Sequence, residues 1–71
     1  MNNELRLQNI LRELDYEIAP LEEKRAAFEK ARLKCDDFST KNYYSGIESS
    51  CESSISLLQK AKEIVRKHFR S

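Results

Sequence analysis

The sequence has very little glycine or proline, no tryptophan and no excess of charge of either sign. One Gly and one Pro in 71 residues argue against a turn-rich β-fold and against low-complexity disorder. Thirteen Lys and Arg residues are balanced by twelve Asp and Glu residues, a net charge of +1. Because no strong field attracts a nucleic-acid backbone or an anionic membrane, we expect no nucleic-acid partner.

Long apolar runs are also missing. No stretch approaches the roughly 20 apolar residues of a membrane span. The opening Met1-Asn2-Asn3-Glu4 lacks the basic and apolar regions of a signal peptide, so we expect neither feature. A chain this short folds around a thin core, which leaves little room for a substrate pocket. We therefore expect that the protein is not an enzyme.

Residues that carry chemistry are few and scattered. Cys35 and Cys51 lack the C-x-x-C spacing of a zinc site, and the single histidine, His68, lies far along the chain. We predict no catalytic residue, no metal site and no cofactor. Both cysteines are expected to be free thiols in a reducing compartment. The alternative is a disulfide that pins the two helix ends near a turn.

The first half of the chain carries a heptad pattern, which predicts one amphipathic helix over about residues 3–36. Pro20 lies inside this pattern and cannot donate a backbone hydrogen bond. The helix is therefore either kinked and continuous or broken near Ala19, and we prefer the kink because the pattern keeps its phase. The repeating positions are Leu7, Leu11, Leu14, Ile18, Leu21, Arg25, Phe28, Arg32 and Cys35.

A second helix is predicted from Ser45 to about residue 69, after a polar turn over about residues 37–44. Ser45 and Glu48 have the spacing of a capping box. The many serines of 45–56 are interpreted as a solvated helix face. One apolar stripe contains Ile47, Cys51, Ile55, Leu58, Val65 and Phe69, and a second contains Leu57, Ala61, Ile64 and His68.

The short connection makes the two helices antiparallel neighbours. The chain is predicted to be all-α, a single coiled-coil-like helical hairpin over residues 1–71. A turn centred near Lys41 places Cys35 beside Glu48, close to Cys51, and sets the acidic stretch 13–23 against the basic stretch 60–70. The predicted core is Leu14, Ile18, Leu21, Phe28, Ile47, Cys51, Ile55, Leu58 and Val65.

This register leaves apolar residues that the hairpin cannot cover. Residues before about Arg12 extend beyond the second helix, and the second stripe faces away from the first helix. Uncovered apolar area of this kind marks a binding or self-association site. The predicted partner-binding residues are Leu5, Leu7, Ile10, Leu57, Ala61 and Ile64.

Three parts of the chain resemble the small co-chaperones of the type III secretion needle subunit. They are Arg6-Leu7-Gln8-Asn9-Ile10-Leu11, Tyr44, and Cys51-Glu52-Ser53-Ser54-Ile55-Ser56-Leu57-Leu58. The resemblance spans most of the chain at low identity, and Pro20 and the serines of 45–56 depart from it. It implies a non-enzymatic protein of the bacterial cytoplasm that binds a larger helical-repeat, TPR-like chaperone. Together they hold the needle subunit monomeric before export, and without its partner the small protein can form a homodimer.

Two other functions fit the same residues. Tyr44-Ser45-Gly46 falls in the predicted turn, where small secreted hairpins of the WXG type carry Trp-x-Gly. The end of the chain, residues 67–71, lacks the C-terminal export signal that is usual in those proteins. The other alternative is a generic coiled-coil adaptor.

Overall fold

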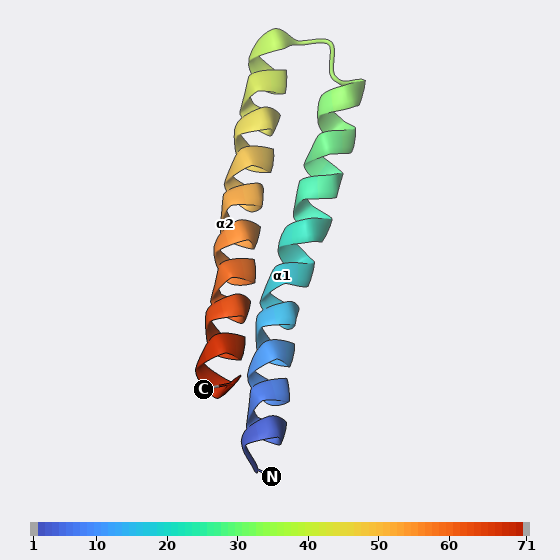
Figure 1. Ribbon diagram of the computed structural model, residues 1–71. Helices are drawn as coiled ribbons and strands as arrows, with labels where there is room; N and C mark the ends of the chain where they lie inside the picture. Colours follow the sequence, from blue (N-terminus) through green and yellow to red (C-terminus); the bar gives the residue numbers. More distant parts are fainter. Residues whose placement is uncertain (1, 71) are drawn as a thin grey trace.

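A computed structural model describes residues 2–70, which form two long α-helices joined by a short loop. Helix α1 spans Asn2–Lys34, helix α2 spans Phe38–Arg70, and residues 35–37 connect them. The helices run side by side in opposite directions and give a rod of 55 × 16 × 11 Å (Figure 1). The predicted all-α antiparallel hairpin is confirmed, with no strand among the described residues.

Helix α1 passes through Pro20 without a break. Pro20 removes one backbone donor from a helix of 33 residues. On either side of it, Ile18 is only 4% exposed and Leu21 is half-buried. Of the two alternatives, the break near Ala19 is therefore wrong, and the helix is continuous, as in the preferred alternative.

The turn is shorter and earlier than predicted. Residues 38–44, predicted to be turn, are the first two turns of α2. Asp37 caps this helix, because its carboxylate accepts hydrogen bonds from the Thr40 backbone N–H at 2.9 Å and from the Thr40 hydroxyl at 2.7 Å. The predicted cap at Ser45 lies inside the helix, and its Glu48 has a different partner, described below.

The earlier turn shifts the register of the whole hairpin. Each helix has 33 residues, so α2 runs back along nearly all of α1. Near the chain ends, Leu7 and Phe69 line the same surface recess. The prediction that all residues before about Arg12 extend beyond the second helix is therefore wrong, because it depended on a turn centred near Lys41. A shorter N-terminal end of α1 does extend past α2 (Figure 1).

The contact between the helices follows one heptad row on each of them, and we call these two rows the inner seam. On the α1 side the inner seam consists of the nine predicted positions, eight on α1 from Leu7 to Arg32 and then Cys35 in the loop, all buried or half-buried. Among the described residues, Ile18 and Cys51 are the two apolar side chains that are only 4% exposed, so the core is thin. The row on α2 is Tyr44, Glu48, Cys51, Ile55, Leu58, Lys62, Val65 and Phe69.

Both cysteines are free thiols in the structure. Cys35 lies in the loop, whereas Cys51 lies thirteen residues beyond the start of α2 at Phe38. At 1.5 Å per residue this is about 20 Å along the helix. The predicted proximity of the two cysteines is wrong, and a bridge between them would need Cα atoms within about 7 Å.

Candidate protein-interaction surface

Glu48 is a charged residue inside the inner seam, and it is only 8% exposed. Its carboxylate accepts a hydrogen bond from Arg32 Nε at 2.6 Å and a longer one from Arg32 Nη2 at 3.5 Å. This hydrogen bond and the negative charge of Glu48 raise the pKa of Arg32. A shifted register would leave the Glu48 carboxylate buried without a partner. The pair therefore selects the observed register.

Lys62 is the second charged residue in the α2 row. Its Nζ lies 2.6 Å from Asp15 Oδ1, and its side chain is 13% exposed. This pair joins the acidic stretch of α1 to the basic stretch of α2, as the sequence predicted. Sequence reasoning nevertheless missed Glu48 and Lys62 as seam positions, because it looked for apolar residues only. The alternating spacing of four and three from Tyr44 to Phe69 was the signal that could have found them.

The aromatic residues near the turn have separate roles. Tyr44 is half-buried, and its ring centroid lies 5.6 Å from that of Phe28. Tyr43 contacts the Tyr44 ring at 6.0 Å but is 66% exposed. Tyr44 thus packs the hairpin near its turn, whereas Tyr43 faces outward.

A second row of residues runs along α2, and we call it the outer seam. Each member directly precedes an inner-seam residue, so the outer seam lies about 100° around the helix from the inner one. It contains the predicted stripe from Leu57 to His68 and extends that stripe towards the turn. Leu57 is 69% exposed and Ile64 is 62% exposed. The full row is Tyr43, Ile47, Ser50, Ser54, Leu57, Ala61, Ile64 and His68.

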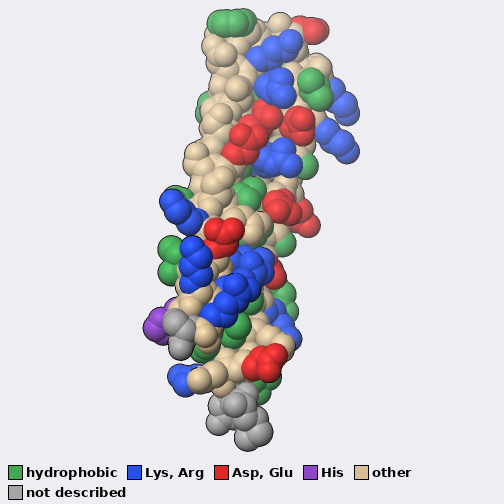
Figure 2. Space-filling model, viewed as in Figure 1, with side chains coloured by type: hydrophobic (Ala, Val, Ile, Leu, Met, Phe, Trp, Pro, Cys, Tyr) green, Lys and Arg blue, Asp and Glu red, His purple; other side chains and the backbone are tan. Residues whose placement is uncertain are grey.

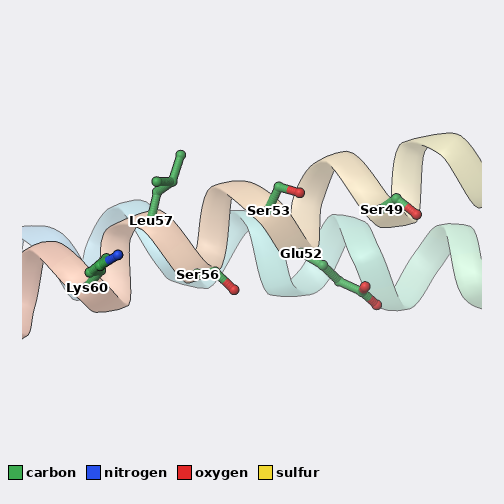
Figure 3. A pocket seen from close by; sticks show the side chains of 6 residues that line it. All are labelled: Ser49, Glu52, Ser53, Ser56, Leu57 and Lys60. Carbon is green, nitrogen blue, oxygen red and sulfur yellow. The ribbon is translucent and has the colours of Figure 1, made fainter.

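A shallow groove borders the outer seam near the middle of α2. In Figure 3, Leu57 projects outward from α2, away from the ribbon of α1. The short serine side chains next to it leave the surface hollow. The predicted solvated serine face is found here, although Ser54 is half-buried. The groove is lined by Ser49, Glu52, Ser53, Ser56, Leu57 and Lys60.

One edge of α1 lies on the same side of the hairpin as the outer seam. Arg6 precedes the inner-seam residue Leu7, and Asn3 and Arg6 share a recess with His68 of the outer seam. On both helices, residues that precede inner-seam positions therefore lie on this side. Ile10, which precedes Leu11 and is 37% exposed, belongs to this edge.

The structure thus brings four of the six predicted partner-binding residues to one side. Leu57, Ala61 and Ile64 lie on the outer seam, and Ile10 lies on the neighbouring edge of α1. Leu7 is half-buried in the inner seam. Leu5 is 60% exposed, but it does not precede an inner-seam position and so lies on the other side.

The two halves of α2 differ in charge. Figure 2 shows Lys and Arg side chains gathered over the C-terminal half of α2, while its N-terminal half is largely uncharged. The basic residues of the C-terminal half are Lys60, Lys62, Arg66, Lys67 and Arg70. A helix that binds along α2 would therefore meet two different electrostatic environments.

Residues 2–70 lack the features of two other kinds of site. In this range no three His, Cys, Asp or Glu side chains come together in a way that could hold a metal ion. Neither of the two helices is long and apolar enough to cross a membrane. The surface feature that the described residues do offer is the outer seam, on an all-α antiparallel hairpin.

No protein-family model matches the chain, and searches of curated proteins and of solved structures find no match.

Proposed function

We propose that this protein is a non-enzymatic co-chaperone of a bacterial type III secretion system. In this proposal it acts in the cytoplasm, where it binds and stabilises a larger helical-repeat chaperone. The resulting complex keeps the needle subunit monomeric before export. The observation that carries the proposal is the outer seam, which presents the exposed apolar side chains of Tyr43, Leu57 and Ile64 at the spacing that a partner helix recognises.

The thin core of the hairpin supports a role in binding. Ile18 and Cys51 are its two deeply buried apolar side chains within residues 2–70, whereas Leu57 and Ile64 remain more than half exposed. Interfaces concentrate their binding energy in a few buried apolar or aromatic anchors. Leu57 and Ile64 are such anchors, because they stand one heptad apart on the same face of α2.

The three resembling segments also have distinct places in the hairpin. Arg6–Leu11 contributes Leu7 and Leu11 to the inner seam, and it contributes Ile10 to the edge of α1 that lies on the same side as the outer seam. Tyr44 packs against Phe28 near the turn. The segment 51–58 carries Leu57 at the centre of the outer seam. These parts of the chain therefore serve both the fold and the proposed interface.

The secreted WXG-type alternative loses its main argument. Tyr44-Ser45-Gly46 lies inside α2 rather than in the turn. A Cβ added at Gly46 would meet no atom within 4 Å, so this glycine does not mark a close approach. A generic coiled-coil adaptor would use the same outer seam, and the identity of the partner separates it from the proposed co-chaperone.

Affinity capture from the native bacterium tests the proposal. The tagged chain should co-purify with a helical-repeat chaperone and with the needle subunit, identified by mass spectrometry. Leu57→Asp should lose both proteins, because it would place an unpaired carboxylate in the interface. Leu33→Asp is a matched control, since Leu33 is also 69% exposed but follows, rather than precedes, an inner-seam residue. Capture of neither protein, or capture that Leu57→Asp does not affect, would contradict the proposal.

A further inference from the structure

We propose that the outer seam binds a second copy of this chain, with the two α2 helices antiparallel, in a symmetric four-helix bundle. This inference stands on the residues of α2 and does not depend on the chaperone proposed above. A two-fold axis between Ser54 and Leu57 makes the outer seam complementary to itself. The dimer would be isologous, with the same surface on both copies.

The complementarity follows from the order of residues along the outer seam. Around the proposed axis, Ser54 lies level with Leu57 of the second copy, so a short side chain meets a long one. Ser50 meets Ala61, and Ile47 meets Ile64. Tyr43 comes level with His68 at each end. A parallel pair would instead place Leu57 against Leu57 and Ser54 against Ser54. The two leucines would then be crowded, and the two serines would leave a gap between the helices.

The charges of α2 favour the same orientation. Residues 38–54 contain one Lys and two Glu, whereas residues 55–70 contain five Lys or Arg and one Glu. An antiparallel pair places the basic half of one copy beside the largely uncharged half of the other, where Glu48 is buried and paired with Arg32. A parallel pair would place the two basic halves together, and like charges disfavour that arrangement.

The proposed register also brings the two α1 helices alongside each other. Leu7 and Phe69 line the same recess near the chain ends, and we take them as level to align α1 with α2; the Asp15–Lys62 pair agrees with this alignment to within one residue. Pairing the α2 helices as proposed then places Glu17 level with Lys24 of the second copy. It also places Ile10 level with Ala31 of the second copy. The same register also brings Arg6 close to Lys34 of the second copy, so α1 adds both favourable and unfavourable neighbours.

The geometry and the surface area fit a four-helix bundle. The inner and outer seams lie about 100° apart around α2, close to the right angle between neighbours in such a bundle. The hairpin exposes 5740 Å² for 8.4 kDa, whereas a compact monomer of this mass exposes about 4600 Å². The excess of roughly 1100 Å² is more than the ~800 Å² per partner that a standard interface buries.

A charge-swap series tests the proposed register. Sedimentation of the unmodified chain should show a dimer. Ile47→Lys and Ile64→Glu should each weaken dimerisation at least tenfold. The double variant should restore dimerisation, because the introduced ammonium of one copy lies level with the introduced carboxylate of the other. The combination of Ile47→Lys with Leu57→Glu is the control, since its new charges lie at different levels and should not rescue. A monomeric unmodified chain, or equal rescue by the control, would overturn the proposal.

Cross-linking gives a second measurement that does not require a charge in the interface. Ile47→Cys and Ile64→Cys are made separately with Cys35→Ser, while Cys51 stays buried. Oxidation of the mixture should give a mixed disulfide between the two variants. Each variant alone should link far less, because equivalent residues lie about 25 Å apart along antiparallel helices. Efficient linking of either variant alone, or no mixed product, would overturn the antiparallel dimer.

Discussion

The half of the hairpin near the turn differs from the half near the chain ends. Near the turn, the inner seam includes Arg25, Arg32 and Glu48. Near the chain ends, it consists of Leu and Ile residues with Val65, Phe69 and the single charge of Lys62. Apolar heptad rows contact each other almost equally well after a slip of one heptad, whereas a buried ion pair does not. The apolar half therefore supplies stability, and the charged half selects the register.

The largest loss is expected in the apolar half. Ile18→Ala should lower the free energy of unfolding by about 2–3 kcal/mol, at the low end for such a change because the surroundings can partly close the gap. Urea unfolding followed by circular dichroism measures the loss. Tyr16→Ala, at a site that is 69% exposed, should change stability by less than about 0.5 kcal/mol. Equal losses in the two variants would show that Ile18 is not the centre of the core.

In the charged half, near the turn, we expect a smaller loss of stability together with a change in the alignment of α1 with α2. Arg32→Met leaves the Glu48 carboxylate, 8% exposed, without its partner, which costs about 1–3 kcal/mol. Arg32→Met with Glu48→Met should recover most of this stability. It should also give two populations of distance between spin labels on α1 and α2. If the double variant instead shows the sum of the two single losses of stability, and a single distance between the spin labels, the Arg32–Glu48 pair does not select the register of the hairpin.

The smallest effect is expected at the cap of α2, outside both halves of the seam. Hydrogen bonds from the Thr40 hydroxyl and then from its backbone N–H lower the pKa of Asp37 in the folded chain. The contribution of Asp37 is therefore complete above the ordinary carboxyl pKa and is lost as the pH falls through the lower folded value.

Thermal melts of the unmodified chain and of Asp37→Ala measure this contribution. The two should differ slightly at neutral pH, and the difference should shrink in acid. A difference that stays constant or grows as the pH falls would show that the Asp37 carboxylate is not what stabilises the start of α2.

These features also explain what the sequence could and could not predict. The α1 row from Leu7 to Cys35 was predicted in full because its apolar spacing is regular. The turn was misplaced because Asp37 and Ser45 both have the chemistry of a helix cap, and local signals cannot choose between them. What decides is tertiary packing: Tyr44 and Glu48 contact Phe28 and Arg32 only when α2 begins before them.

The candidate interface was predicted in part for the same reason. The stripe of Leu57, Ala61 and Ile64 depends only on helical spacing within α2, so an error in the turn did not affect it. The predicted N-terminal extension depended on the register between the helices, and it is shorter than predicted because the turn lies earlier in the chain (Figure 1). The continuation of the outer seam to Tyr43 became visible only once residues 38–44 were known to be helical.

The central claim is that the outer seam of α2 is an interface and not part of the hairpin core. Paired circular dichroism and sedimentation of Leu57→Asp and Leu33→Asp test it most directly, because both positions carry leucine and both are 69% exposed. We predict that both variants remain helical and that only Leu57→Asp loses self-association. Collapse of helicity in Leu57→Asp alone, or equal self-association of the two variants, would contradict the claim.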